Sequence, residues 1–411
     1  MSMSDDPDRL IRGFLAVGTD ELPDHAYDDL RWTIDRTRQR PAMARWSIPF
    51  MPGPTWLASI AVVVAAAVLG ASMLPRALAP SVIEAGSTVT IPSIWSQPAS
   101  IAFTATFPSN VPEGLYWKAK TYNQFTLNSW QQSTVDKLPT PANAPLLAGS
   151  AENPDPRLTT PVTATVHPEG YADNAVLSPG TPTKVSRDAT VLVSGDGHWF
   201  AGVEMSGIRD GYDVTASRLT TDPTIISGSL LAAASRDYPR DITGLYTDVP
   251  ADALGPAATS LLTSIHGTLT RDDPYDLAVA IETYLRDPNN FTYTTDLRGV
   301  NCQAASAVEC FVRSRKGYCL HYASTMAMLL RAAYPNDPVP TRLVQGFLPG
   351  TRAGATDTVL NQEAHAWVEV YFPDYGWIPF DPTGSISQMT ILPVTPSGSP
   401  SATPATASSQ P

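Results

Sequence analysis

The chain has 411 residues, of which 43% are hydrophobic and 16% charged, so it has enough apolar material for packed cores and is not wholly disordered. A chain of this length forms about two or three domains. The formal net charge of −12 argues against nucleic acid as a partner, because a protein that binds phosphates needs a basic surface. The three cysteines all lie between Cys302 and Cys319, which excludes a disulfide-rich scaffold.

A transmembrane helix is predicted over residues 55–75. No Lys, Arg, Asp or Glu occurs from Trp46 to Pro75, and about twenty apolar residues in a helix span the ~30 Å core of a bilayer. A buried core helix is one alternative, but the run has no polar stripe. A cleaved signal peptide is the other, and it would start much nearer the N-terminus. The sequence therefore favours an uncleaved anchor.

The charges beside this segment predict its orientation. Five arginines precede it between Arg31 and Arg45, whereas Arg76 is the only basic residue between the segment and Lys118. Basic residues stay on the cytoplasmic side of a membrane. We therefore expect residues 1–50 to be a cytoplasmic tail and the rest of the chain to lie outside, as in a single-pass protein of the cell membrane.

Residues 85–225 are predicted to form a β-rich, sandwich-like extracytoplasmic domain. Short segments rich in β-branched and aromatic residues alternate with a period of two and are separated by turns rich in Gly, Pro, Ser and Asp. The clearest of them are 100–107, 114–125, 160–168, 189–195 and 212–219.

Helices and strands are mixed in residues 250–385, which we expect to be a second, α+β domain. A helix is predicted over 273–287, where Asp272 or Asp273 can cap the N-terminus and Pro274 occupies the first turn. Residues 291–297 have the composition of a strand. The final stretch, 390–411, is uncharged and rich in Pro, Ser and Thr, as in a disordered stalk or linker.

A reactive thiol is predicted at Cys319. The segment 317–323 (GYCLHYA) leads from a glycine turn into an apolar helix and brings the cysteine into the first helical turn. The helix dipole and the unpaired N–H groups there stabilise a thiolate. A lone cysteine can equally be a small buried apolar residue, so this motif needs partners to indicate chemistry.

Two strands supply candidate partners. Residues 365–371 (HAWVEVY) alternate, with His365, Trp367, Glu369 and Tyr371 on one face. A second strand follows the turn at 373–375. If the loop comprises residues 372–376, residue 371 pairs with 377, and Asp381 lies diagonal to His365 within side-chain reach. His365 alone could be an ordinary half-exposed strand residue.

Together, a thiol at a helix start, a histidine on a strand and a carboxylate on the next strand form a Cys-His-Asp set. In such a set His365 accepts the proton of Cys319, and Asp381 fixes the tautomer of the ring and stabilises the imidazolium.

These motifs resemble the transglutaminase-like superfamily, and within it the bacterial membrane-anchored members. The resemblance rests on GYCLHYASTMAMLLR, PVPTRLVQGF and HAWVEVYFPDYGWIPFDPT, in that order, within residues 250–385. It implies a papain-like core preceded by a β-rich region, with Cys319 as nucleophile, His365 as base and Asp381 as orienting carboxylate. We expect no cofactor and no metal.

Cys302 and Cys310 stand outside the family motif. A disulfide across a short loop is the favoured interpretation for a segment outside the cytoplasm. Two free thiols are the alternative. A zinc site with His321 lacks a fourth ligand at suitable spacing.

The sequence thus predicts an outward-facing thiol enzyme, a peptidase, an amidase or a transglutaminase, that acts on protein or peptide substrates such as those of the cell wall. A non-catalytic module that binds wall or surface proteins is the alternative. The sequence has no HExxH motif to suggest a metal-dependent hydrolase.

Overall fold

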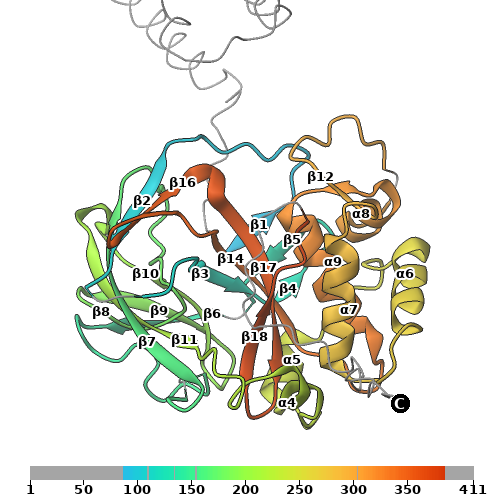
Figure 1. Ribbon diagram of the computed structural model, residues 1–411, viewed down its shortest axis with the longest axis horizontal. Coiled ribbons are helices and arrows are strands. Elements are labelled where there is room, and N and C mark those ends of the chain that lie inside the picture. The colour runs from blue at the N-terminus through green and yellow to red at the C-terminus, as the bar shows by residue number, and fades with distance from the viewer. Residues whose placement is uncertain (1–86, 109–110, 134, 153–154, 303, 385–411) are drawn as a thin grey trace, which may run out of the picture. The chain divides into compact units, whose positions relative to one another are not determined.

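The structure, a computed structural model, describes residues 87–384 except 109–110, 134, 153–154 and 303 (Figure 1). The predicted cytoplasmic tail, transmembrane helix and C-terminal stalk lie outside these residues. Within the described ranges, no helix is both long enough and apolar enough to cross a membrane.

Two large antiparallel sheets dominate the fold. The seven-stranded sheet has the order β18-β17-β14-β3-β10-β9-β6, and the six-stranded sheet has the order β15-β16-β2-β7-β11-β8. The strands of the first are β3 (Trp117–Tyr122), β6 (Val135–Thr140), β9 (Ala189–Ser194), β10 (Trp199–Glu204), β14 (Thr341–Phe347), β17 (Ala364–Phe372) and β18 (Gly376–Phe380). Those of the second are β2 (Ile101–Thr106), β7 (Thr159–Pro168), β8 (Thr181–Val185), β11 (Tyr212–Leu219), β15 (Thr351–Ala353) and β16 (Thr356–Leu360).

Two small sheets complete the β structure. One contains β1 (Thr88–Thr90), β4 (Gln124–Phe125) and β5 (Ser129–Gln131), and the other pairs β12 (Thr292–Tyr293) with β13 (Lys316–Gly317) in parallel. The predicted strand over 291–297 is thus only two residues long.

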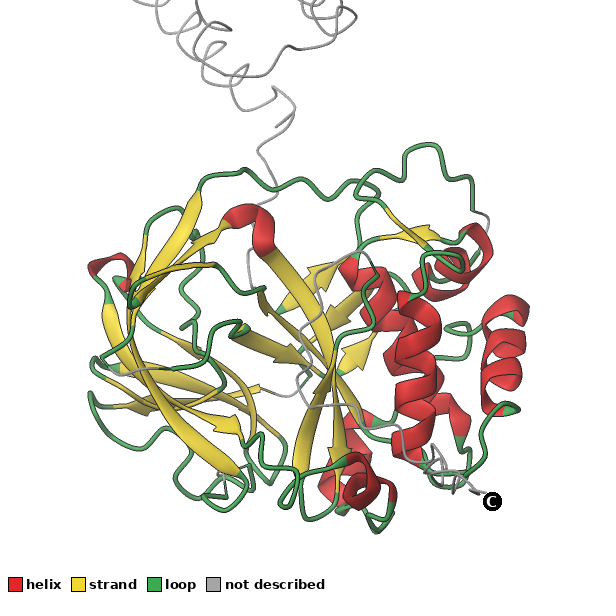
Figure 2. Cartoon of the chain, in the orientation of Figure 1, coloured by secondary structure: helices red, strands yellow, loops and turns green. Residues whose placement is uncertain are grey.

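The α-helices of the described chain all follow residue 227 and gather on one side of the sheets (Figure 2). They are α4 (Gly228–Ala232), α5 (Arg240–Tyr246), α6 (Pro256–His266), α7 (Pro274–Arg286), α8 (Ala307–Ser314) and α9 (Cys319–Ala333). Helix α7 begins as the sequence predicts, with Pro274 in its first turn and the Asp273 side chain accepting a hydrogen bond from the N–H of Asp276. Such an N-cap contributes about 1 kcal/mol.

The two regions expected from the sequence share both large sheets. Strand β3 pairs with β14, and β2 pairs with β16, so each sheet contains strands from 85–225 and from 250–385. One apolar core lies between the sheets, and a second joins the helices to β14, β17 and β18. The expected mixed α and β structure is present, and the β-rich half contributes strands to the sheet on which the helices pack.

Arg331 connects the central helix α9 to the seven-stranded sheet. Its buried guanidinium donates hydrogen bonds to the carbonyl oxygens of Asn123, Asp248 and Thr341, at 2.8, 2.8 and 2.5 Å. Burial lowers the pKa of Arg331 to about 9, because these acceptors are neutral. The three bonds join α9 to the first residue of β14, to the residue after β3 and to the loop after α5.

Candidate active site

Cys319 is the first residue of α9, as the sequence predicts. Tyr318 precedes it in extended conformation (φ −127°, ψ 179°), and the helix then begins. The thiol side chain is fully buried, and Cys319 is the free cysteine of the chain. Tyr318 stacks on Trp95 at 5.3 Å between ring centroids and donates a hydrogen bond to the carbonyl of Pro92. The segment before the first long strand therefore packs against the start of this helix.

His365 lies near the start of β17, opposite Gly346 in the neighbouring strand β14. A Cβ atom at Gly346 would lie 1.8 Å from the carbonyl oxygen of Trp117, so only glycine lets β14 approach β3 closely at this point. The His365 ring is buried, and its Nε2 lies 2.9 Å from Oδ2 of Asp381. The Cys319 side chain lies close enough to help raise the pKa of this ring. The structure thus brings the three predicted residues together.

Asp381 directly follows β18, and the predicted strand register is confirmed. Tyr371 pairs with Trp377, so residues 367 and 381 fall at opposing positions just beyond Val368 and Phe380, the last pair of the ladder. The carboxylate also accepts hydrogen bonds from the Tyr116 hydroxyl, at 2.5 Å, and from the backbone N–H of Thr383, at 3.1 Å.

The protonation of the pair follows from these contacts. Burial lowers the pKa of His365, but the charge of Asp381, the hydrogen bond to Asp381 and the interaction with Cys319 outweigh this effect and raise the pKa to about 10. Burial raises the pKa of Asp381, but the His365 ring and the hydrogen bonds to its carboxylate lower it to about 2. The ring is therefore an imidazolium beside a carboxylate over the physiological pH range.

We expect the stability contributed by His365 to depend on pH. Its folded pKa of about 10 lies above the ordinary value of 6.5, so the contribution is complete below about pH 6.5 and is lost as the pH rises towards 10. Urea unfolding of the wild type and of His365→Gln should show a stability difference that shrinks by on the order of a few kcal/mol between about pH 6 and 10. A difference that stays constant over that range would contradict the ion pair.

Helix α7 holds the backbone of Asp381 through two side chains that the sequence analysis did not single out. Glu282 accepts a hydrogen bond from the N–H of Asp381 at 2.9 Å, and Arg286 donates one to its carbonyl oxygen at 2.8 Å. Burial raises the pKa of Glu282 to about 7. Residues four positions apart lie on one face of a helix, so the sequence shows that Glu282 and Arg286 share a face. It does not show that this face meets Asp381.

Tyr293 was also missed, and it lies next to the thiol. Strand β12 pairs Tyr293 with Gly317 in β13, two residues before Cys319. Burial raises the pKa of Tyr293, and so do the electrostatic interactions with the nearby Cys319 and Asp381. A phenol therefore lies close to both of these residues.

Glu369, the remaining acidic residue on the His365 face of the strand, has other partners. It pairs with Lys118 at 2.5 Å and with Arg342 at 2.7 Å. Arg342 also pairs with Glu152 at 2.6 Å and lies 4.1 Å from the ring of Trp377. Glu369 therefore belongs to a buried ion cluster on the seven-stranded sheet.

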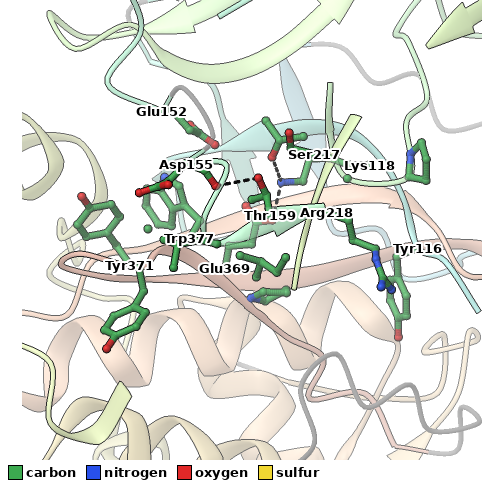
Figure 3. A pocket seen from close by; sticks show the side chains of 18 of the residues that line it. Tyr116, Lys118, Glu152, Asp155, Thr159, Ser217, Arg218, Glu369, Tyr371 and Trp377 are labelled. Atoms are coloured by element: carbon green, nitrogen blue, oxygen red, sulfur yellow. Dashed lines mark hydrogen bonds and ion pairs between the residues drawn. The ribbon is translucent and has the colours of Figure 1, made fainter. Parts of the chain in front are cut away.

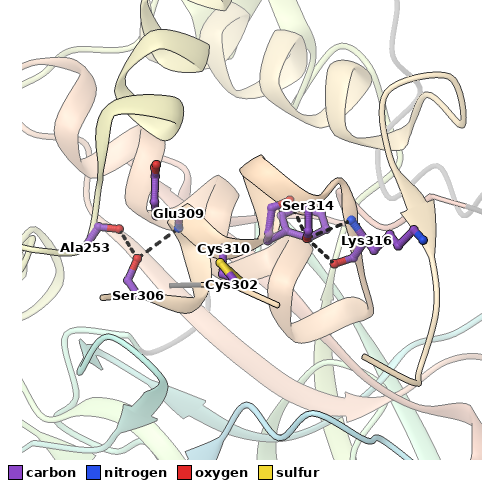
Figure 4. Close-up of a disulfide and its surroundings, with 8 residues drawn as sticks. Ala253, Cys302, Ser306, Glu309, Cys310, Ser314 and Lys316 are labelled. Atoms are coloured by element: carbon purple, nitrogen blue, oxygen red, sulfur yellow. Dashed lines mark hydrogen bonds between the residues drawn. A yellow bond between two sulfur atoms is a disulfide. The ribbon is translucent and has the colours of Figure 1, made fainter. Parts of the chain in front are cut away.

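The favoured interpretation of the other two cysteines is confirmed. Cys302 and Cys310 form a disulfide with a Cα–Cα distance of 5.6 Å (Figure 4). It joins the loop before α8 to that helix. Beside it, Ser306 caps α8 by accepting from the N–H of Glu309, whose carboxylate in turn accepts from two N–H groups at the start of α6.

A cavity of about 870 Å³ lies beside this site (Figure 3). Its wall includes Tyr116 and Trp367, and none of Cys319, His365 and Asp381 lines it. The His365 ring lies 6.0 Å from the Tyr116 ring and 6.5 Å from the Trp367 ring, between centroids. The cavity is therefore separated from the His365–Asp381 pair by one layer of aromatic side chains.

Comparison with known proteins agrees with the resemblance seen in the motifs. A family model described as the transglutaminase-like superfamily matches residues 263–382, a range that contains Cys319, His365 and Asp381. The similarity to this superfamily is thus shown for residues 263–382. This part of the chain, the transglutaminase-like core, contains α7, α8, α9 and the strands β14 to β18.

Two curated proteins match the chain over a similar length. A protein-glutamine gamma-glutamyltransferase of Pseudomonas aeruginosa is 34% identical over 118 residues, and the uncharacterized protein YebA of Bacillus subtilis is 37% identical over 123 residues. Each match covers 28% of this chain and 16% of the relative, so the chain matches about a sixth of the length of these curated relatives.

Among solved structures, the periplasmic domain of TgpA from Pseudomonas aeruginosa is similar with a TM-score of 0.51. The match covers 72% of this chain and 93% of that domain at 20% sequence identity. It extends well beyond the transglutaminase-like core, so the β-rich half shares in the common fold.

Proposed function

We propose that the chain is a thiol enzyme that acts on carboxamide groups of proteins or peptides through Cys319, His365 and Asp381. The observation that carries the proposal is the arrangement of His365, whose Nε2 lies 2.9 Å from the Asp381 carboxylate and whose ring interacts with the nearby Cys319 side chain. A ring held as an imidazolium can give a proton to a leaving group and then take one from the next nucleophile. The transglutaminase-like core supports the same chemistry.

The reaction follows from these roles. Cys319 reacts as the thiolate beside the His365 imidazolium. Its sulfur attacks the carbonyl carbon, and the carbonyl oxygen becomes an oxyanion that the backbone N–H of Cys319 can stabilise. The carbon–nitrogen bond then breaks, the leaving ammonia or amine takes a proton from His365, and a thioester remains on Cys319. A second nucleophile that loses its proton to His365 resolves the thioester.

We propose that the second nucleophile is a primary amine, so that the enzyme is a transglutaminase. Cys319 is completely buried, and Tyr293 and Tyr318 pack near it, so little water can reach a thioester there. The Pseudomonas relative is named a protein-glutamine gamma-glutamyltransferase, which agrees with this choice.

The experiment uses the purified full chain, a glutaminyl peptide, and mass spectrometry with and without a primary amine. We expect an amine adduct on the glutamine to form faster than deamidation. Deamidation alone would make the protein an amidase, and a shortened peptide would make it a peptidase. If no product forms and Cys319 reacts with iodoacetamide equally fast in wild type and His365→Ala, the fold serves as a non-catalytic binding module.

The domain is proposed to work outside the cytoplasm, held by the predicted helix at 55–75. The arginines before that segment support this orientation, and the structurally similar TgpA domain is periplasmic. Alkaline phosphatase fused after residue 90 should therefore be active. Activity only in a fusion at the N-terminus would reverse the topology.

A further inference from the structure

The cavity beside the active site has the chemistry of a separate binding site. Its walls come from both large sheets, including β3, β17 and β18 on one side and β11 on the other. At about 870 Å³ it is within the range of small-molecule and cofactor sites. None of the three proposed catalytic residues lines it, so what it binds need not be the group that reacts with Cys319.

The wall combines aromatic rings with acceptors of hydrogen bonds. Six of the lining residues are aromatic, namely Tyr116, Trp199, Trp367, Tyr371, Tyr375 and Trp377. Carboxylates and hydroxyls lie among these rings, including Asp374 and Thr159. Asp155 and Thr181 also line the cavity, where they accept hydrogen bonds from Arg157 and Lys118. Carboxylates accept hydrogen bonds and cannot donate them, so this wall suits a ligand with many O–H donors and apolar C–H faces. A sugar has both, whereas a peptide backbone offers one N–H per residue.

Arg218 adds a positive charge that has no ion-pair partner among the residues the structure describes. Tyr212, Val214 and Ala216 point into the core from β11, and strand alternation continues this face at Arg218. Among the described residues, none accepts a hydrogen bond from the buried Nε of Arg218, and no ion pair neutralises its guanidinium. By contrast, Lys118 in the same wall pairs with Glu369.

Arg218 lies at one end of the cavity. In Figure 3, Arg218 and Tyr116 extend to one end, while Tyr371, Trp377 and Glu152 lie at the other. A half-buried guanidinium without a carboxylate partner is unfavourable unless an anion joins it, and its planar fork fits a carboxylate. The buried indole N–H of Trp377 also has no acceptor among the described residues.

We propose that this cavity binds a short sugar chain that carries a carboxylate, with the carboxylate on Arg218 and the sugar rings against the tryptophan and tyrosine side chains. The ligand contacts Tyr116, which donates to Asp381, and Trp367, which stacks near His365. A bound sugar therefore contacts the two aromatic side chains that pack next to His365 and Asp381. It also brings Cys319 close to substrates that are linked to acidic glycans.

Two disaccharides of similar size test the proposal. One is N-acetylglucosaminyl-N-acetylmuramic acid, which has a free carboxylate, and the other is chitobiose, which lacks it. Binding is measured by isothermal titration calorimetry and tryptophan fluorescence in the full chain carrying Cys319→Ala, so the outcome does not depend on catalysis. We expect the acidic disaccharide to bind at least about tenfold more tightly than chitobiose, with a preference that weakens in high salt.

Substitutions then assign the carboxylate to Arg218. Arg218→Met should bring the two affinities within about twofold of each other, and Arg218→Lys should keep part of the preference because it keeps the charge. Arg313→Met, an exposed arginine on α8, should change neither affinity. Melting curves identify variants that do not fold. If Arg218→Met does not fold, the test is whether high salt weakens the preference of the parent protein for the acidic disaccharide. The proposal would be overturned if both sugars bound equally or if neither bound. It would also be overturned if a tetrapeptide with a free carboxyl terminus bound in their place and depended on Arg218.

Discussion

Cys319→Ala should lower the rate of amine incorporation into a glutaminyl peptide by at least about 10⁴-fold, because it removes the atom that forms the thioester. Residual activity can come only from substrate binding and from the backbone N–H of Cys319. The measurement is ammonia release together with mass analysis of the peptide. The substituted side chain is buried and close in size to the original, so the protein should still fold.

The other two cysteines provide the control. Replacing both Cys302 and Cys310 by alanine removes the disulfide and should lower the stability by about 2 kcal/mol or more, while leaving the thioester chemistry in place. If instead Cys319→Ala retains turnover and the double variant loses it, the reacting thiol is not at the start of α9.

Asp381→Asn is expected to lower turnover by on the order of 10- to 1000-fold, less than the loss in Cys319→Ala. The asparagine cannot stabilise the imidazolium by charge, and its NH₂ group can face the His365 Nε2–H. The measurement is kcat against pH, since the loss of the carboxylate should also lower the pKa of His365 from its raised value. Tyr116→Phe, which removes a single donor to Asp381, should have a smaller effect.

Glu369→Gln is the matched control, because Glu369 lies on the same strand as His365. It should reduce the free energy of unfolding by about 3 kcal/mol or more, since Lys118 and Arg342 lose a buried partner. Its turnover should stay near that of the wild type. If Asp381→Asn folds and keeps full turnover while Glu369→Gln does not, the orienting carboxylate has been assigned to the wrong residue.

Local patterns in the sequence predicted the parts of the site that depend on local geometry. The first turn of α9 follows from the glycine turn and the apolar run after Cys319. The pairing of β17 with β18 follows from strand alternation and a short turn, which fixes Tyr371 opposite Trp377. The disulfide joins residues only eight positions apart. Each of these features depends on neighbours in the chain, so periodicity and spacing determine them.

The contacts that support the site join distant segments, and these the sequence did not reveal. Tyr116 and Asp381 are separated by 265 positions, and Glu282 and Asp381 by 99. The sequence also did not reveal that the two regions share their sheets, because β3 pairs with β14 across more than two hundred residues. Alternation shows which face of a strand is buried but not which strand lies beside it. Alternation along β11 places the charged side chain of Arg218 on the inward face of the strand. The sequence did not indicate that a cavity surrounds it.

The most direct test of the proposed chemistry is to trap the acyl group on the enzyme. The full chain is mixed with a glutaminyl peptide, quenched in acid, digested and analysed by mass spectrometry. We expect the acyl part of the substrate on the fragment that contains Cys319, and we expect it to disappear in Cys319→Ala, to fall strongly in His365→Gln and to be discharged by a primary amine. Turnover of the peptide with no acyl group on Cys319, or with the acyl group on another residue, would contradict the account.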